Sequence, residues 1–299
     1  MAANEQESRN SRRNLLRFGL GGAVAASLPA APARAASPAL TAEAEEGPYY
    51  LDLNLVRADL GEGLPGVPLQ ISLTVLDETG TPLPGARVDV WHCDTRGVYS
   101  GYAHQGDERK IDTRGKAFLR GTQLTNAEGM VAFHSIYPGW YSGRTTHIHC
   151  KVIQGGHALL TTQFFLPDSL SEYLYTELTQ YRRDRLRDTL NHTDNIAVEA
   201  GPTTIGSIRE GKERYVASLT IVVDRAARST GRHPTFFGGA GPDGPPPGAP
   251  SGPPPDSFHE PGANDPGFLG MRHSPLGHRT LAGADRVLVI VPGVKREEI

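Results

Sequence analysis

The sequence predicts an all-β protein built as a β-sandwich, with short helices and long loops between the strands. Two observations predict this class: many short segments alternate apolar and polar residues or are rich in β-branched residues, and Gly, Asn and Asp turns separate them. The 38% of hydrophobic and 21% of charged residues are typical of a globular protein with some unstructured sequence. The net charge of −3 gives no indication of a nucleic-acid-binding surface.

Seven strands are predicted, beginning with Pro68–Leu76, which alternates apolar and polar residues and closes on a turn at Asp77–Gly80. The other six are expected at Ala86–Cys93, Lys116–Thr122, Met130–Ser135, Thr146–Ile153, Leu159–Phe165 and Tyr215–Val223. Residues Pro167–Leu190 combine charges with helical periodicity, which favours one or two short helices in a looped excursion.

The first 35 residues predict an export signal. Arg12 and Arg13 precede a short apolar stretch at Phe18–Leu28, and Ala33–Ala35 is a small-residue cleavage sequence. This pattern resembles a twin-arginine signal peptide, which is an address and not an anchor; an ordinary signal or a basic tail is the alternative. We expect residues 1–35 to be removed and the mature protein to be periplasmic or extracellular. The sequence contains no run of about 20 apolar residues, so no stable membrane span is predicted.

Beyond the signal, the sequence divides into a catalytic or binding domain at residues 36–230 and a tail at residues 231–299. From Gly231 to Gly267, 20 of 37 residues are Gly or Pro, a composition that cannot build a packed core. Arg286–Val291 is a short apolar run. It is expected either to dock on the sandwich or on a partner subunit, or to belong to an unstructured tail.

One segment, Ile136–Ile153, carries the side chains with the clearest chemistry. His147 and His149 are two residues apart in a predicted strand, so both imidazoles point to one face and can hold one metal. Tyr141 follows a Pro-Gly turn that can aim it back, and Tyr99 lies just beyond another predicted strand. Two imidazoles and two phenolates form an N2O2 donor set, which favours Fe(3+) over zinc.

These motifs resemble the intradiol ring-cleavage dioxygenases, the family of catechol and protocatechuate dioxygenases, and in particular its secreted subgroup. The resemblance runs from Glu46 to about Val223 and rests on the segments GPYY, RADLGEGLPGVPL, PLPGARVDVWHCDTRGVYSGY, FLRGTQLTNAEGMVAF, IYPGWYSGRTTHIH and LTTQFF. It implies one Fe(3+) per chain, with Tyr141 and His147 as axial ligands and Tyr99 and His149 as equatorial ligands.

The resemblance also implies catalytic roles. Tyr141 would be both a metal ligand and a general base for the substrate, Arg144 would stabilise negative charge on the ring, and Gln163 matches an active-site glutamine. Pro48 and Tyr49 would line the substrate pocket. The implied reaction opens a catechol-type ring with O2, between the two hydroxyl-bearing carbons, to a cis,cis-muconate-type product without an organic cofactor.

One departure from the cytosolic members concerns the loop between two implied ligands. Only Ser142–Thr146 separate Tyr141 from His147, where those enzymes insert a longer loop, so a more open pocket is expected. Which catechol is used stays open. The oligomeric state also stays open, and a homodimer is one of the alternatives.

Three further questions are left open by the sequence. The strand-turn pattern of Leu73–Trp91 also occurs in transthyretin-like binding or adhesion modules, which need no such donor set. A ferrous extradiol enzyme or cupin uses two histidines and a carboxylate, and no carboxylate lies near the histidine pair. Cys93 and Cys150 could form a disulfide outside the cell. Cys150 should face away from the metal in either case.

Overall fold

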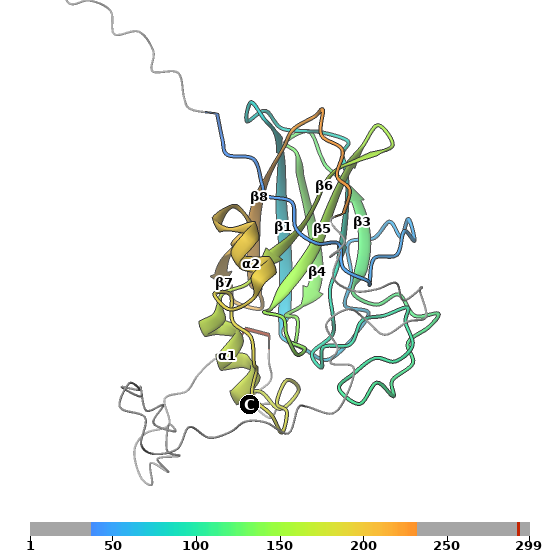
Figure 1. Cartoon of the computed structure of the whole chain (residues 1–299), viewed down its shortest axis with the longest axis vertical. Helices are drawn as coiled ribbons and strands as arrows, with labels where there is room; N and C mark the ends of the chain where they lie inside the picture. The colour runs from blue at the N-terminus through green and yellow to red at the C-terminus, as the bar shows by residue number, and fades with distance from the viewer. Residues whose placement is uncertain (1–36, 232–291, 294–299) are drawn as a thin grey trace, which may run out of the picture. The chain divides into compact units, whose positions relative to one another are not determined.

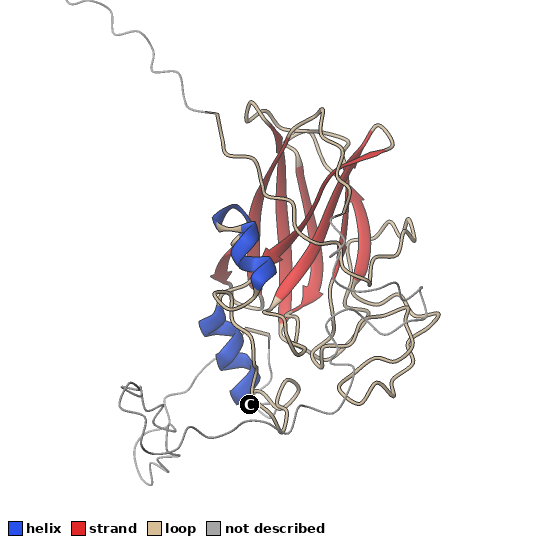
Figure 2. Ribbon diagram, in the orientation of Figure 1, coloured by secondary structure: helices blue, strands red, loops and turns tan. Residues whose placement is uncertain are grey.

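The computed structural model describes residues 37–231 and 292–293, and in this part the chain forms a sandwich of two four-stranded sheets (Figures 1 and 2). The first sheet has the order β4-β1-β8-β7, with bounds Met130–Ile136, Pro68–Asp77, Tyr215–Val223 and Ser207–Glu210. The second sheet has the order β3-β2-β5-β6, with bounds Arg120–Leu124, Arg87–Trp91, His147–Gln154 and His157–Phe165. The predicted all-β sandwich is confirmed.

The strand pairing is mixed, since β1 runs antiparallel to β4 but parallel to β8, whereas the second sheet is antiparallel throughout. Six predicted strands lie close to their expected bounds. The strand expected at Lys116–Thr122 instead begins at Arg120, because Leu119 has a φ of 56° and donates its N–H to Leu60 outside the sheet.

The helices are short and lie on one side of the sandwich (Figure 2). Helix α1 spans Asp168–Glu177 and falls in the predicted excursion. Helix α2 spans Asn195–Ala200, beyond the predicted range, and is followed by the 3-10 turn η1 at Pro202–Thr204. The side chain of Asp194 accepts hydrogen bonds from the first turn of α2 and so sets where this helix begins.

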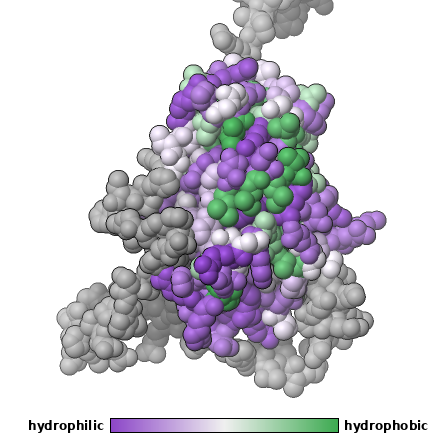
Figure 3. All heavy atoms as spheres, turned by 90° about the vertical axis from the view of Figure 1, so that its right-hand side faces the viewer, coloured by the Kyte–Doolittle hydropathy of each residue, from purple (hydrophilic) through white to green (hydrophobic). Residues whose placement is uncertain are grey.

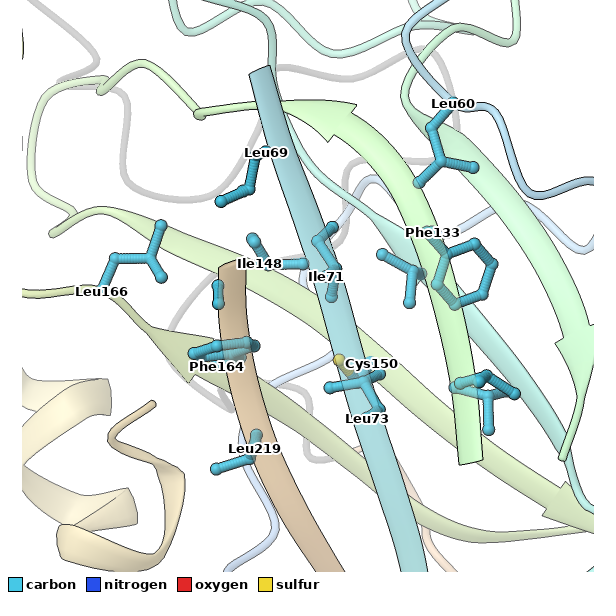
Figure 4. Packing of buried hydrophobic residues seen from close by; sticks show 14 of the residues in the cluster. Leu60, Leu69, Ile71, Leu73, Phe133, Ile148, Cys150, Phe164, Leu166 and Leu219 are labelled. Carbon is cyan, nitrogen blue, oxygen red and sulfur yellow. The ribbon is translucent and has the colours of Figure 1, made fainter. Parts of the chain in front are cut away.

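The hydrophobic core lies between the two sheets, and the alternation of β5 decides which of its side chains enter it. Ile148, Cys150 and Val152 are fully buried there, with Cys150 near Leu73 of β1 (Figure 4). His147 and His149 therefore point to the outer face of the second sheet, as the sequence predicts. Cys150 faces the core.

On that outer face a row of four side chains crosses the whole second sheet. Trp91 of β2 pairs in register with Arg120 of β3 on one side and with His149 of β5 on the other. His149 in turn pairs with Gln163 of β6. The register of three strand pairs thus brings residues from four distant parts of the sequence into one line next to the histidine pair.

The N-terminal segment of the described chain crosses the sandwich and is held at both ends. Thr41 donates to Val222 and Ala44 donates to Thr161. Glu43 accepts hydrogen bonds from Ser229, Thr230 and Gly231. The contacts of the sandwich therefore continue to Gly231.

The described surface carries some exposed apolar side chains. Val56 and Leu124 are 71% and 64% exposed, and Val56 bridges to Thr122 of the edge strand β3. Figure 3 shows apolar surface gathered among hydrophilic residues on the face turned to the viewer. Among the described residues no helix is long and apolar enough to span a membrane. Arg286–Val291 lies outside the described residues, but Pro292 is buried.

Candidate metal centre

Four side chains converge on one point at the end of β5. The hydroxyl of Tyr99 lies 3.5 Å from that of Tyr141, 3.3 Å from His147 Nε2 and 3.2 Å from His149 Nε2. His147 Nε2 lies 3.1 Å from the Tyr141 hydroxyl and 3.1 Å from His149 Nε2. The structure thus brings together the four residues that the sequence selects, including two tyrosines from loops outside the strands.

These distances fit ligands that share one metal ion. Neighbouring ligands with bonds of about 2.1 Å lie about 3.0–3.4 Å apart, and opposite ligands about 4.2 Å apart. The five contacts of 3.1–3.5 Å match the first case. Two phenol oxygens with two imidazole nitrogens form a hard donor set suited to ferric iron.

The same distances bear on the axial pair that the resemblance implies. The donor atoms of Tyr141 and His147 lie 3.1 Å apart. The described hydrogen bonds join every pair of the four donors except Tyr141 and His149. Tyr99 and His147 each lie within 3.5 Å of the other three donor atoms.

Both histidines are prepared to bind as neutral imidazoles. His147 Nδ1 donates to the carbonyl of Thr145 at 2.6 Å, which leaves the lone pair of Nε2 free for a metal. Burial, reinforced by the positive charge of Arg144, lowers the pKa of His147 to about 3. Burial and the neighbouring His147 lower the pKa of His149 well below its usual value.

The two tyrosines differ in their access to solvent. Tyr99 is 1% exposed and Tyr141 is only partly buried. Burial raises the pKa of Tyr99 well above its ordinary value. Burial also raises the pKa of Tyr141 to about 12, against the lowering effect of Arg144. A bound metal ion would favour the ionised phenol of both.

Trp91 packs directly on one of the ligands. Its indole is stacked on the imidazole of His149, with ring centroids 4.7 Å apart and an interplanar angle of 11°. His149 Nδ1 is buried and makes no hydrogen bond within the described residues. The two histidines are therefore held differently: His147 by a hydrogen bond and His149 by an aromatic ring.

The predicted pocket residues line the approach to these ligands. Tyr49 stacks on Tyr99, with ring centroids 4.2 Å apart and an interplanar angle of 14°. A Cβ added to Gly47 would lie 3.5 Å from His149 Cε1, so the backbone just before the exposed Pro48 passes beside the site. Arg120 ties this segment down, donating to the Tyr49 carbonyl at 2.5 Å.

Arg120 also holds the loop that carries a ligand. Its side chain donates to the hydroxyl and to the carbonyl of Ser100, at 2.8 and 2.7 Å, next to Tyr99. The guanidinium of Arg120 thus holds the segment around Tyr49 and the loop around Ser100 in place relative to each other.

Arg144 and Gln163 meet beside the ligands, as the sequence predicts. An Arg144 N–H donates to Gln163 Oε1, and Gln163 Nε2 donates to the Glu45 carbonyl at 2.7 Å. On its other side Arg144 Nε donates to Asp194 Oδ2 at 2.9 Å. The sequence gives no indication of Asp194, because it lies 50 residues away in a segment without a motif.

Other candidates for metal binding lie elsewhere or have other partners. Among the described residues, no group of three or more His, Cys, Asp or Glu side chains could hold a metal ion. The tyrosines are thus needed to complete a set. Cys93 and Cys150 are both buried and unbonded, so the structure contains no disulfide between them. His92 is engaged with Ser135 and the Cys93 carbonyl.

Comparisons with known proteins agree with this centre. The sequence profile of the family described as "Dioxygenase" matches residues 43–205, more than half of the chain. A solved structure of an intradiol ring-cleavage dioxygenase from Tetranychus urticae is similar with a TM-score of 0.59 and 30% identity, over 64% of this chain and 98% of that one. The chain belongs to the intradiol ring-cleavage dioxygenase family.

Curated relatives match a smaller part of the chain. Catechol 1,2-dioxygenase of Acinetobacter baylyi is 28% identical over 179 residues, which are 52% of this chain and 55% of that enzyme. The protocatechuate 3,4-dioxygenase beta chain of Burkholderia cepacia is 30% identical over 151 residues, 47% of this chain and 63% of that protein. The chain thus spans about half the length of the curated relatives that it matches.

Proposed function

We propose that this protein is an iron(III) dioxygenase that opens catechol-type rings with O2 between the two hydroxyl-bearing carbons, giving muconate-type products. The observation that carries the proposal is the convergence of Tyr99, Tyr141, His147 and His149 within 3.1–3.5 Å. A ferric ion held there would act as a Lewis acid toward both catechol oxygens and draw electron density from the ring.

Tyr141 is the residue best placed to take a proton from the substrate. It is the ligand tyrosine with partial access to solvent, and it stands at the start of a loop rather than within a strand. Burial raises the pKa of Tyr141 to about 12, so its phenolate would be a strong base toward a catechol hydroxyl. A catechol hydroxyl bound beside it can therefore lose its proton to the Tyr141 oxygen.

Arg144 supplies a fixed positive charge beside the ring. Its side chain is 16% exposed and is held from two sides, by Gln163 and by Asp194. A preorganised cation stabilises negative charge that develops on a substrate without having to reorient. Tyr49 and Pro48 would contact the ring from the opposite wall, and the short loop Ser142–Thr146 would leave this pocket more open.

Iron content, colour and oxygen uptake test the proposal. The iron-loaded protein should absorb visible light through tyrosinate bound to Fe(III) and consume O2 with a panel of catechols. His149→Ala should lose iron and colour together, whereas His157→Ala, at an exposed position on β6, should keep both. Full iron occupancy in His149→Ala would remove that residue from the site. A transthyretin-like binding module would stay colourless.

We further propose that the protein is exported by the twin-arginine route, with residues 1–35 as the signal, 36–230 as the dioxygenase domain and 231–299 as the tail. The sequence pattern around Arg12 and Arg13 supports export. Replacing both by Lys should leave folded, active enzyme in the cytoplasm. Normal export of that variant would rule out this route.

A further inference from the structure

The loop that joins two of the proposed ligands is held by a carboxylate from a distant part of the chain. Asp194 is 2% exposed, and its Oδ2 atom accepts two hydrogen bonds, from Arg144 Nε at 2.9 Å and from the Thr145 N–H at 2.9 Å. Its other oxygen accepts from Ile196 and Ala197 at the start of α2. One buried side chain thus joins helix α2 to the centre of the loop.

Each of the two bonds to Oδ2 leads to the metal centre by a different route. Through Arg144, Asp194 fixes the guanidinium that also donates to Gln163. Through the N–H of Thr145, it holds the residue whose carbonyl, in the next peptide, accepts the Nδ1 proton of His147 at 2.6 Å. Asp194 therefore constrains both the position of the Arg144 guanidinium and, through Thr145, the orientation of the His147 ring.

The charge of the carboxylate is also matched to its surroundings. Burial by itself raises the pKa of Asp194, but the charge of Arg144 and the Thr145 N–H lower it below its ordinary value. The ionised carboxylate balances a guanidinium that would otherwise be a buried, unpaired cation. An amide at this position would leave the charge of Arg144 uncompensated.

We propose that Asp194 is a positioning residue, which sets the orientation of Arg144 toward the substrate and of His147 toward the metal. The proposal rests on the proposed function, since it assigns Asp194 a role in that same site. It does not make Asp194 a ligand or a catalytic residue. Partners of this kind typically contribute 10–100-fold to metal affinity or activity.

Two substitutions separate this role from the capping of α2. Asn and Ser are both favoured at the start of a helix, so Asp194→Asn and Asp194→Ser should preserve the helix while removing the charge that holds Arg144. The matched control is Asp188→Asn. Asp188 is exposed and accepts hydrogen bonds from Ser142 and Gly143 of the same loop, without touching Arg144.

With the full mature, iron-loaded chain, we expect both Asp194 variants to fold and to keep the native iron content, with a lowered melting temperature because the buried guanidinium of Arg144 loses its counter-charge. Their kcat should fall about 10–100-fold, while catechol affinity, measured by anaerobic optical titration, stays near the native value. Their tyrosinate-to-iron absorption band should shift, because the His147 hydrogen bond is altered. Asp188→Asn should retain kcat within about twofold, as expected for an exposed carboxylate.

The remaining outcomes overturn one of the two proposals. Native kcat and an unshifted band in both Asp194 variants, or loss of fold and iron in both, would overturn the positioning role. A native protein that binds iron but opens no catechol would instead overturn the proposed function. The shift of the band in the Asp194 variants would then still decide the positioning role.

Discussion

Trp91 and His149 are stacked face to face across neighbouring strands, with ring centroids 4.7 Å apart. They are direct partners in the register of β2 and β5, so the sheet itself sets this contact. Since His149 Nδ1 has no hydrogen-bond partner within the described residues, ring contacts hold the ring plane, and the indole is the one stacked on it. The second sheet thus orients a ligand through a side chain that the sequence marks only as packing.

Replacing Trp91 by Leu should weaken iron binding. An aromatic pair contributes about 0.5–1.5 kcal/mol beyond its buried area, so the dissociation constant for iron should rise about 2–10-fold. Trp91→Phe keeps a ring against His149 and serves as the control. Competition with an iron chelator measures both. Equal iron affinity in Trp91→Leu and the native protein would mean that His149 is held by other contacts.

Tyr141→Phe should keep iron but slow the binding of catechol. The three other donors remain within 3.1–3.3 Å of one another, while the group that accepts the substrate proton is gone. Stopped-flow mixing with catechol in the absence of O2 measures the binding step. Tyr99→Phe, at the fully buried position, should instead lower iron content. Native binding and turnover rates in Tyr141→Phe would exclude its proton-transfer role.

Acid should destabilise the protein in part through His92. Burial lowers the pKa of His92 from 6.5 to about 4 in the folded chain. Between these values the unfolded chain binds a proton that the native chain does not, so the free energy of unfolding falls as the pH drops from 6.5 toward 4. The loss from this group is on the order of 3 kcal/mol.

Denaturant titrations at several pH values test this assignment. His92→Gln retains an acceptor for Ser135 and a donor for the Cys93 carbonyl but does not titrate. Its unfolding free energy should therefore vary less between pH 6.5 and 4 than that of the native protein. The same slope in both proteins would place the acid sensitivity elsewhere.

Two truncations test where the catalytic domain ends. A chain ending at Gly231 should fold, bind iron and open catechol. A chain ending at Arg228 loses the bond from Ser229 to the Ala158 carbonyl and three donors to Glu43, and should be less stable by about 1–3 kcal/mol. Thermal unfolding compares the two. A chain ending at Gly231 that is colourless would show that the tail belongs to the catalytic fold.

Most strands and the convergence of the two histidines on one face could be predicted from local sequence. Alternation fixes the face to which a strand side chain points, so His147 and His149 were placed together and Cys150 was placed in the core. Alternation says nothing of angles around a metal. The axial pair of Tyr141 and His147 rests on resemblance alone and stays a prediction.

Contacts between distant segments could not be predicted in the same way. An Asp before a short helix indicates only a helix start, and nothing local to Asp194 reveals Arg144, 50 residues earlier in the chain. Likewise Trp91 and Arg120 acquire their roles from the register of β2 with its two neighbours. The short strand β7 was missed because its four residues are mostly exposed and show no apolar face.

The two histidines of the candidate centre lie on the outer face of the second sheet, and the apolar core lies on the other face of that sheet. Connecting segments around Gly47–Tyr49, Tyr99 and Ser142–Thr146 contact these histidines and contribute no side chain to the main core cluster. Because these connecting segments are separate from the core, they can be lengthened or exchanged without repacking the interior. Substrate range can then diversify through insertions and deletions in these segments while the ligand strand and its support stay constant.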